Sequence, residues 1–241
     1  MNEAVQNRYI YVKMSIRALK RSPSVKTLSY LFRYFSPWRK YLVKERNSVI
    51  DKQPWLTFPA IDFIKGVLNP GMRVFEFGSG GSTLFWAYRT KEVISVEHDE
   101  KWYLLMKQTL KEQKIGNVSY FFIPPQNEAN SIGKDPGNPG DYISSDEQYK
   151  NESFKEYATS IDRYQPEFFD IILVDGRARP SCIAHALGKL KKNGYLVIDN
   201  SERNYYLEPF TFEAPGWKVY RFYGPVPYTH SFSETTIIEK R

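Results

Sequence analysis

Seven short apolar runs recur along the chain after residue 70, and segments with helical spacing separate most of them. The runs are rich in Val, Ile, Leu and Phe, which is typical of strands that are covered on both faces of a sheet. They lie at 74–77, 92–97, 118–123, 169–176, 194–200, 217–223 and 234–240. The alternation with helical segments predicts a doubly wound α/β fold with a mostly parallel, seven-stranded sheet. The last two runs predict an antiparallel C-terminal hairpin.

The first 50 residues have a different pattern, in which apolar side chains recur at three- and four-residue spacing among basic ones. One such stripe consists of Leu28, Leu31, Phe35, Trp38 and Leu42. This spacing predicts amphipathic helices, and the pairs Ser22-Pro23 and Ser36-Pro37 are predicted helix starts. We therefore expect a basic amphipathic helical extension over 1–50 and an α/β domain over 51–241.

The formal net charge of +7 originates in the predicted extension. Residues 1–50 hold 11 Lys and Arg against two acids, whereas the rest of the chain holds 23 bases and 25 acids. The preferred interpretation is a helical extension packed on the domain or on another subunit. Contact of residues 8–46 with a membrane surface or a lipid-linked substrate comes next, and nucleic acid binding is the least favoured.

Other features of the composition limit the cellular setting. The single cysteine, Cys182, excludes an internal disulfide, and a reducing compartment is the simplest setting. Arg8, Lys13 and Arg17 interrupt the N-terminal segment, so it lacks the apolar core of a signal peptide. We expect a soluble cytoplasmic protein that is peripheral to a membrane if the extension binds one.

A glycine-rich turn follows the first predicted strand, in the stretch VFEFGSGGSTLFWA at 74–87. Glycine lets the backbone approach a ligand closely, and Ser82 or Thr83 is suited to cap the helix that follows. The dinucleotide fingerprint requires a third glycine where this chain has Thr83, which argues against a dehydrogenase. Glu76, two residues before the first glycine, is costly to bury without a partner, and an amine-bearing ligand would be one.

This stretch resembles the first motif of the class I S-adenosylmethionine-dependent methyltransferases, which reads acidic-x-Gly-x-Gly. The resemblance implies that the turn lies along the methionine part of the cofactor. Glu97 ends the second strand, where a doubly wound fold places a carboxylate on the ribose hydroxyls. His98 beside it would pack against the adenine or be solvated. The implied cofactor residues are Glu76, Gly78, Ser79, Gly80, Ser82, Thr83, Glu97 and His98.

Three other segments are candidates for ligand contacts on the same edge of the sheet. Gln126, Asn127 and Glu128 follow the third strand and could bind the adenine edge. The segment 51–59, with Trp55 and Phe58, precedes the first strand, where the family often covers the cofactor or substrate; ordinary core packing is the alternative. The polar, Gly- and Pro-rich segment 130–150 is a candidate substrate lid, and a helix is predicted over 146–164.

Acidic side chains end the fourth and fifth strands at Asp175 and Asp199, and Asn200 follows. Neighbouring strands lie about 4.8 Å apart, so these oxygens can converge on Mg²⁺. The set is similar to that of the catechol and caffeoyl-CoA O-methyltransferases, but a lysine of that family is replaced by Ala178, with Arg177 and Arg179 beside it. Asp175 or Asp199 could instead act as a metal-free base, orient a hydroxyl, or cap the next helix.

These patterns predict a methyltransferase that uses S-adenosylmethionine, with oxygen on a small molecule or a glycan or lipid-linked precursor as the preferred acceptor. One alternative is an RNA methyltransferase whose residues 8–46 bind phosphates. The other is a non-catalytic module of the same fold that binds a membrane surface through its N-terminal helices.

Overall fold

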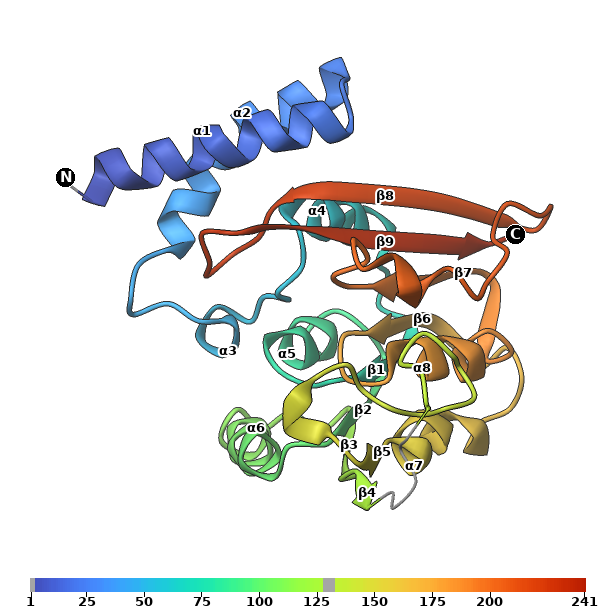
Figure 1. Ribbon diagram of the computed structural model, residues 1–241. Helices are drawn as coiled ribbons and strands as arrows, with labels where there is room; N and C mark the ends of the chain where they lie inside the picture. The colour runs from blue at the N-terminus through green and yellow to red at the C-terminus, as the bar shows by residue number, and fades with distance from the viewer. Residues whose placement is uncertain (1–2, 128–132) are drawn as a thin grey trace.

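A seven-stranded sheet forms the centre of the computed structural model, which describes residues 3–127 and 133–241. Its strand order is β3-β2-β1-β6-β7-β9-β8 (Figure 1). Neighbours from β3 to β7 are parallel, whereas β9 is antiparallel to both β7 and β8. The strands are β1 (Arg73–Phe77), β2 (Glu92–Glu97), β3 (Val118–Phe122), β6 (Phe169–Val174), β7 (Leu190–Ile198), β8 (Trp217–Pro225) and β9 (Phe232–Lys240). The predicted doubly wound α/β fold with its antiparallel C-terminal hairpin is confirmed.

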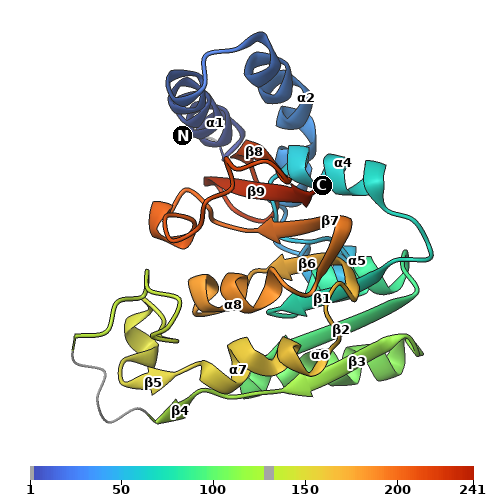
Figure 2. The same cartoon turned by 90° about the vertical axis from the view of Figure 1, so that its right-hand side faces the viewer.

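Different helices cover the two faces of the sheet, because successive side chains along a strand point to opposite sides (Figure 2). Val74 of β1 packs on one face with helices α4 (Phe58–Val67) and α5 (Gly81–Ala87). Helix α6 (Glu100–Glu112) packs beside α5 on this side. Phe75 and Phe77 pack on the other face with α7 (Lys155–Thr159) and α8 (Arg179–Ala186).

The carboxyl ends of the central strands meet at one rim of the sheet. The Gly78 N–H donates to Val96 O at 3.0 Å, and the Asp175 N–H donates to Phe77 O at 2.9 Å. The Asp199 N–H donates to Val174 O at 3.3 Å. The ladder therefore continues past the strand ends and holds the residues that follow β1, β6 and β7 side by side at this rim.

The N-terminal segment forms two helices, α1 (Glu3–Arg21) and α2 (Val25–Tyr41), which lie beside β8 and β9 (Figure 1). A separate buried cluster joins them to the sheet, and it includes Tyr11, Trp38, Phe58 and Phe232. The Trp38 indole N–H also donates to Thr229 O at 3.0 Å. Among the described residues, no helix is long and apolar enough to cross a membrane.

The predicted helix starts in this segment are wrong. Ser24, two residues after Ser22, caps α2 and accepts a hydrogen bond from the Thr27 N–H at 3.0 Å. Pro37 lies inside α2, so the Ser36-Pro37 pair does not begin a helix. The buried Trp38 follows it directly, and tertiary packing of this side chain accompanies continuation of the helix through the proline.

Two further boundaries differ from the prediction. In place of one helix over 146–164 there are a 3-10 turn η1 (Glu147–Tyr149), a short strand β5 (Glu152–Ser153) paired with β4 (Gln126–Asn127), then α7 and η2 (Ser160–Arg163). Asn151 has a φ of +65°, which interrupts a right-handed helix. The proposed adenine contact Glu128 and residues 130–132 of the proposed lid lie outside the described residues.

Candidate active site

Glu76 is fully buried in β1, and one of its carboxylate oxygens lacks a partner. Its Oε2 accepts hydrogen bonds from the Thr83 hydroxyl at 2.6 Å and the Ser95 hydroxyl at 2.7 Å. Its Oε1 has no hydrogen-bond partner among the described residues. Burial raises the pKa of Glu76 to about 7, and the nearby hydroxyls of Ser82, Thr83 and Ser95 oppose the rise. An ammonium group would supply the missing donor and favour the ionised form.

The predicted glycine turn is present beside Glu76. Gly78 has a φ of +91°, and a Cβ there would lie 2.9 Å from the Gly176 nitrogen, so only glycine fits. Gly80, and neither Ser82 nor Thr83, occupies the N-cap of α5. Thr83 Oγ1 accepts the Gly80 N–H at 3.0 Å and donates to Glu76, so this residue connects the turn to the carboxylate. Ser82 is buried in the first turn of α5.

Glu97 faces the same turn, but the protein already occupies its oxygens. Oε2 accepts the Ser79 N–H at 3.0 Å and the Ser79 hydroxyl at 2.7 Å. Oε1 accepts the backbone N–H groups of His98 at 2.8 Å and Asp99 at 3.0 Å. Burial alone would raise the pKa of Glu97, but these donors and the His98 ring outweigh it and lower the pKa. A ribose hydroxyl would therefore have to replace the Ser79 hydroxyl, which also contacts Tyr120.

His98 is packed and not solvated. Its ring centroid lies 5.3 Å from Tyr149, 5.6 Å from Phe154 and 5.8 Å from Tyr157. Its Nδ1 lies 2.9 Å from Glu97 Oε1. The solvated alternative is therefore wrong, and packing of this ring against an adenine remains a prediction. The aromatic neighbours come from η1 and α7, within the segment for which the sequence predicted one long helix.

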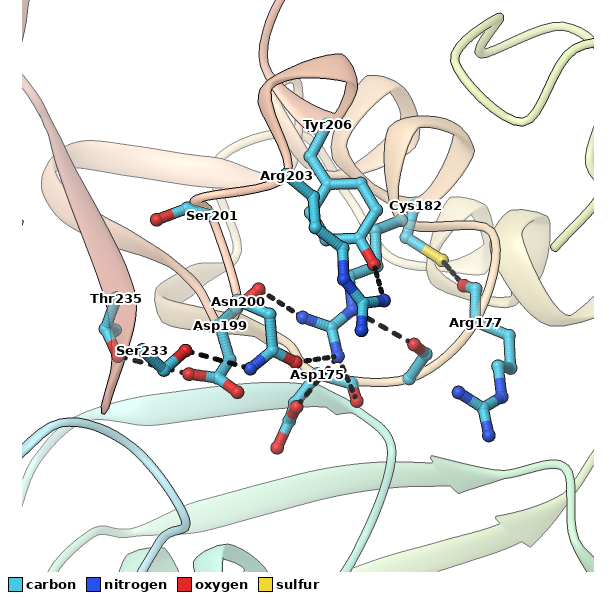
Figure 3. Close-up of polar contacts among 12 residues, drawn as sticks. Asp175, Arg177, Cys182, Asp199, Asn200, Ser201, Arg203, Tyr206, Ser233 and Thr235 are labelled. Carbon is cyan, nitrogen blue, oxygen red and sulfur yellow. Dashed lines mark hydrogen bonds and ion pairs between the residues drawn. The ribbon is translucent and has the colours of Figure 1, made fainter. Parts of the chain in front are cut away.

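Asp175, Asp199 and Asn200 lie close together at the strand ends (Figure 3). The Arg179 guanidinium donates hydrogen bonds to oxygen atoms of all three residues. Its Nη2 donates to Asp175 Oδ1 and to Asn200 Oδ1, both at 3.1 Å, and its Nη1 donates to the Asp199 carbonyl oxygen. The side chain is 6% exposed and keeps its positive charge at any ordinary pH. A divalent cation at Asp175, Asp199 and Asn200 would have to displace this guanidinium.

The predicted Mg²⁺ site therefore does not fit these residues. Arg179 already donates to one oxygen of Asp175 and to the Asn200 amide oxygen, which are two of the three predicted ligand groups. The sequence showed only that Arg179 follows Ala178, the residue that replaces the lysine of the O-methyltransferase family. That the side chain folds back from α8 onto the strand ends depends on the backbone turn at Ala178, which has a φ of +44°.

Asp175 and Asp199 are the titratable groups of this rim. Burial raises the pKa of Asp175 to about 6, and Arg179 and Arg177 oppose the rise. Burial, and then the charge of Asp175, raise the pKa of Asp199 well above its ordinary value. Asp199 Oδ1 accepts a hydrogen bond from the Thr235 hydroxyl at 3.1 Å. Asp175 is thus mostly ionised near neutral pH, whereas burial and the charge of Asp175 make ionisation of Asp199 harder than that of a free aspartate.

Both acids line a polar cavity of about 300 Å³. Trp55, from the loop before α4, borders this cavity, and covering of a ligand by 51–59 remains a prediction. Phe58 is part of the core. The β8–β9 hairpin supplies hydroxyl groups that no sequence motif indicated. The full lining is Trp55, Asp175, Asp199, Asn200, Val226, Thr229, Ser231 and Ser233.

Comparison with solved structures identifies the fold. No family model and no curated protein matches this sequence. The protein SMU.1697c from Streptococcus mutans, solved in complex with SAH, is 15% identical with a TM-score of 0.52, over 75% of this chain and 94% of that chain. An O-methyltransferase from Bacillus cereus, also solved with SAH, is 13% identical with a TM-score of 0.53, over 88% and 91% of the two chains.

At these identities the similarity establishes the fold and not the substrate. The TM-scores of 0.52 and 0.53 extend over at least three quarters of this chain, so the similarity covers most of the α/β sheet and its helices. The chain has the class I S-adenosylmethionine-dependent methyltransferase fold.

Proposed function

We propose that this protein is an S-adenosylmethionine-dependent methyltransferase that acts on a hydroxyl group. The observation that supports this most is the unpartnered, buried Oε1 of Glu76, which lies at the glycine turn. Glu76 is paired in the sheet with Leu173, two residues before Asp175, so the two carboxyl groups belong to adjacent strands. A ligand that carries an ammonium at Glu76 therefore extends toward Asp175 and the polar cavity.

The residues present fit the cofactor, provided that Ser79 yields its hydrogen bond to Glu97. Glu76 would hold the amino group, Gly78 and Gly80 would allow close approach of the methionine part, and Glu97 would hold the ribose. The cofactor, when bound, supplies a methyl group on a positively charged sulfur. The protein would contribute mainly by holding the acceptor in line with that methyl group, since fixing two reactants in one geometry can supply about 7 to 11 kcal/mol.

Asp175 is the proposed group that accepts the proton of the acceptor hydroxyl. Its pKa of about 6 makes it mostly ionised at neutral pH while leaving it basic enough to accept a proton. Asp199, which also lines the cavity, would orient the acceptor hydroxyl through a hydrogen bond. Arg179 fixes the position of Asp175 through the contact at 3.1 Å and is a positioning residue in this scheme.

The cavity favours a polyhydroxylated acceptor, such as a small sugar or a glycan precursor. It combines the aromatic ring of Trp55 with two carboxyl groups, the Asn200 amide and the hydroxyls of Thr229, Ser231 and Ser233. Carboxylates and amides pair with sugar hydroxyls, and an aromatic ring packs on the apolar face of a sugar. These polar groups could form hydrogen bonds with several hydroxyls of one sugar. A flat apolar acceptor would leave the same polar groups without partners.

The direct test is transfer of labelled methyl from S-adenosylmethionine to a panel of monosaccharides, sugar phosphates and nucleotide sugars. We expect transfer to at least one member, and loss of about 10²- to 10⁴-fold in kcat for Asp175→Asn. An unchanged kcat for Asp175→Asn with an active acceptor would remove the proposed proton transfer. Transfer only to RNA would favour the nucleic acid alternative.

We also propose that the N-terminal helices bind an anionic membrane surface. The side of α1 and α2 away from the sheet exposes large apolar side chains, namely Val5, Tyr9, Val12, Ile16, Val25, Leu28 and Phe32. Several of them border an apolar groove of about 490 Å³ between the helices. Arg8 borders the groove, and Lys13, Arg17 and Lys20 of the same helix are exposed, so the charge of α1 is complementary to anionic lipid. Binding of RNA phosphates would leave these apolar side chains in water, whereas insertion into a bilayer would bury them. Binding at a membrane surface is also compatible with a lipid-linked acceptor.

A further inference from the structure

A second cavity, of about 240 Å³, lies on the other side of Arg179 from the acceptor cavity. Its lining begins at Gly176, directly after Asp175, and continues into the first turn of α8. The 3-10 turn η3 (Asn204–Tyr206) and the segment 143–146 complete its wall. The Arg179 side chain therefore borders this second cavity and also donates hydrogen bonds to Asp175 and Asn200. Those two residues line the cavity of about 300 Å³ proposed for the methyl acceptor, the acceptor cavity.

Three guanidinium groups line this second cavity, against one carboxylate. Arg177 pairs with that carboxylate, Asp146, at 3.1 Å, and Arg179 pairs with Asp175 at 3.1 Å. Arg203 forms no ion pair with any residue that the structure describes, and its Nη1 donates to the Tyr206 hydroxyl at 2.8 Å. Positive charge is therefore in excess at this place, and Arg203 retains N–H donors for a ligand.

The other groups in the wall are also suited to an anion. Ser144, Ser145 and Tyr205 contribute hydroxyl groups, and the Ser145 and Tyr205 oxygens lie 2.8 Å apart. The N-terminus of α8, which favours negative charge, opens at the same cavity. Donors come from several directions, so a tetrahedral group with three free oxygens fits better than a planar carboxylate with two.

We propose that this cavity binds a phosphoryl group, and that the group belongs to the methyl acceptor. Arg203 supplies the free guanidinium, with Arg177 and the hydroxyls of Ser144 and Ser145 around it. The assignment to the acceptor rests on the function proposed above, whereas phosphate binding itself does not. A phosphorylated sugar or a diphosphate-linked precursor would place its hydroxyls at Asp175 and its phosphoryl group beyond Arg179.

The test uses the full chain and two probes, inorganic phosphate and pyrophosphate, titrated at constant ionic strength against sodium chloride. We expect saturable binding to the wild type and an affinity that is roughly tenfold or more weaker for Arg203→Gln. Arg203→Lys, which keeps the charge, should retain part of the affinity. Arg89→Gln, at an exposed arginine on another surface, is the matched control and should bind as the wild type does.

Equal binding by Arg203→Gln and the wild type, or no phosphate effect beyond that of chloride, would overturn the site. Competition of bound phosphate by glucose 6-phosphate would indicate a soluble acceptor, and competition by vesicles with phosphatidic acid a lipid-linked one. A parallel titration with SAH separates this proposal from the function. Phosphate binding with no SAH binding retains the site and removes the methyltransferase, and the reverse result removes only the site.

Discussion

Arg179 Nη2 lies 3.1 Å from Asp175 Oδ1, at the point where the sequence predicted a divalent cation. The contact joins a permanent cation to an acid that ends β6. Arg179 also reaches Asn200 Oδ1, so it replaces a metal as the positive centre of the rim. This relationship determines which chemistry the strand ends can perform, because it stabilises the acids without providing open coordination positions.

The first prediction concerns metal ions. Because Arg179 occupies the convergence point, methyl transfer should be unchanged by EDTA and not raised by added Mg²⁺. Calorimetric titration of Mg²⁺ into the wild type should give only dilution heat. A saturable binding signal for Mg²⁺ that is absent in Asp199→Asn would show that a metal ion displaces the Arg179 guanidinium and would contradict this prediction.

The second prediction concerns the stability of the rim. Arg179→Met removes the cation that pairs with the partly buried Asp175 and contacts the backbone carbonyl oxygen of Asp199, which should lower the free energy of unfolding by about 2 to 3 kcal/mol. Urea denaturation at neutral pH measures this difference. Lys111→Met, at an exposed side chain of α6, is the control and should cost under about 1 kcal/mol. A loss for Arg179→Met as small as that of the control would mean that the contact contributes little.

The third prediction concerns the pH dependence of stability. The pKa of Glu76 is about 7 in the folded chain, against an ordinary value of 4.5. Because the folded chain binds the Glu76 proton more tightly than the unfolded chain, protonation of Glu76 stabilises the folded state. This contribution is complete below about pH 4.5 and is lost as the pH rises through about 7. Unfolding curves at several pH values should therefore show the wild type losing on the order of 3 kcal/mol relative to Glu76→Gln between pH 4.5 and 8. Parallel pH profiles of the two proteins would mean that the pKa of Glu76 is not raised.

The fourth prediction concerns the membrane surface. Ile16 and Phe32 are 51% and 77% exposed and both border the groove between α1 and α2. Ile16→Glu and Phe32→Glu should each reduce pelleting with anionic vesicles several-fold, because they place a negative charge in the apolar face. Leu104→Glu, at a residue of α6 that is 56% exposed, is the control and should pellet as the wild type does. Equal pelleting of all four proteins would exclude this face as the binding surface.

Much of the fold could be predicted from the sequence because buried strands have a strong local signal. The second strand was predicted over 92–97 and has the bounds Glu92–Glu97. The single helix predicted over 146–164 is wrong, because Tyr149, Phe154 and Tyr157 of this segment pack around His98 from a 3-10 turn and a short helix. The spacing of residues within 146–164 cannot indicate that they pack against His98, which lies far away in the sequence.

The candidate site could be predicted only as far as strand ends determine it. Glu76, Glu97, Asp175 and Asp199 were found because parallel strands bring their carboxyl ends to one rim. The role of Arg179 was not found, because a long side chain can reach several places and its turn is set by the left-handed Ala178. Nor could the sequence indicate that the Ser79 hydroxyl already donates a hydrogen bond to the Glu97 carboxylate.

The most direct measurement is isothermal titration of SAH into the folded wild-type protein, with Ser79→Ala and Glu97→Gln as companions. We predict saturable binding to one site, about tenfold or more weaker in Glu97→Gln and changed by less than about threefold in Ser79→Ala, because the ribose replaces the Ser79 hydroxyl. Dilution heat alone from properly folded wild-type protein would contradict the proposal that this glycine turn and these acids bind S-adenosylmethionine.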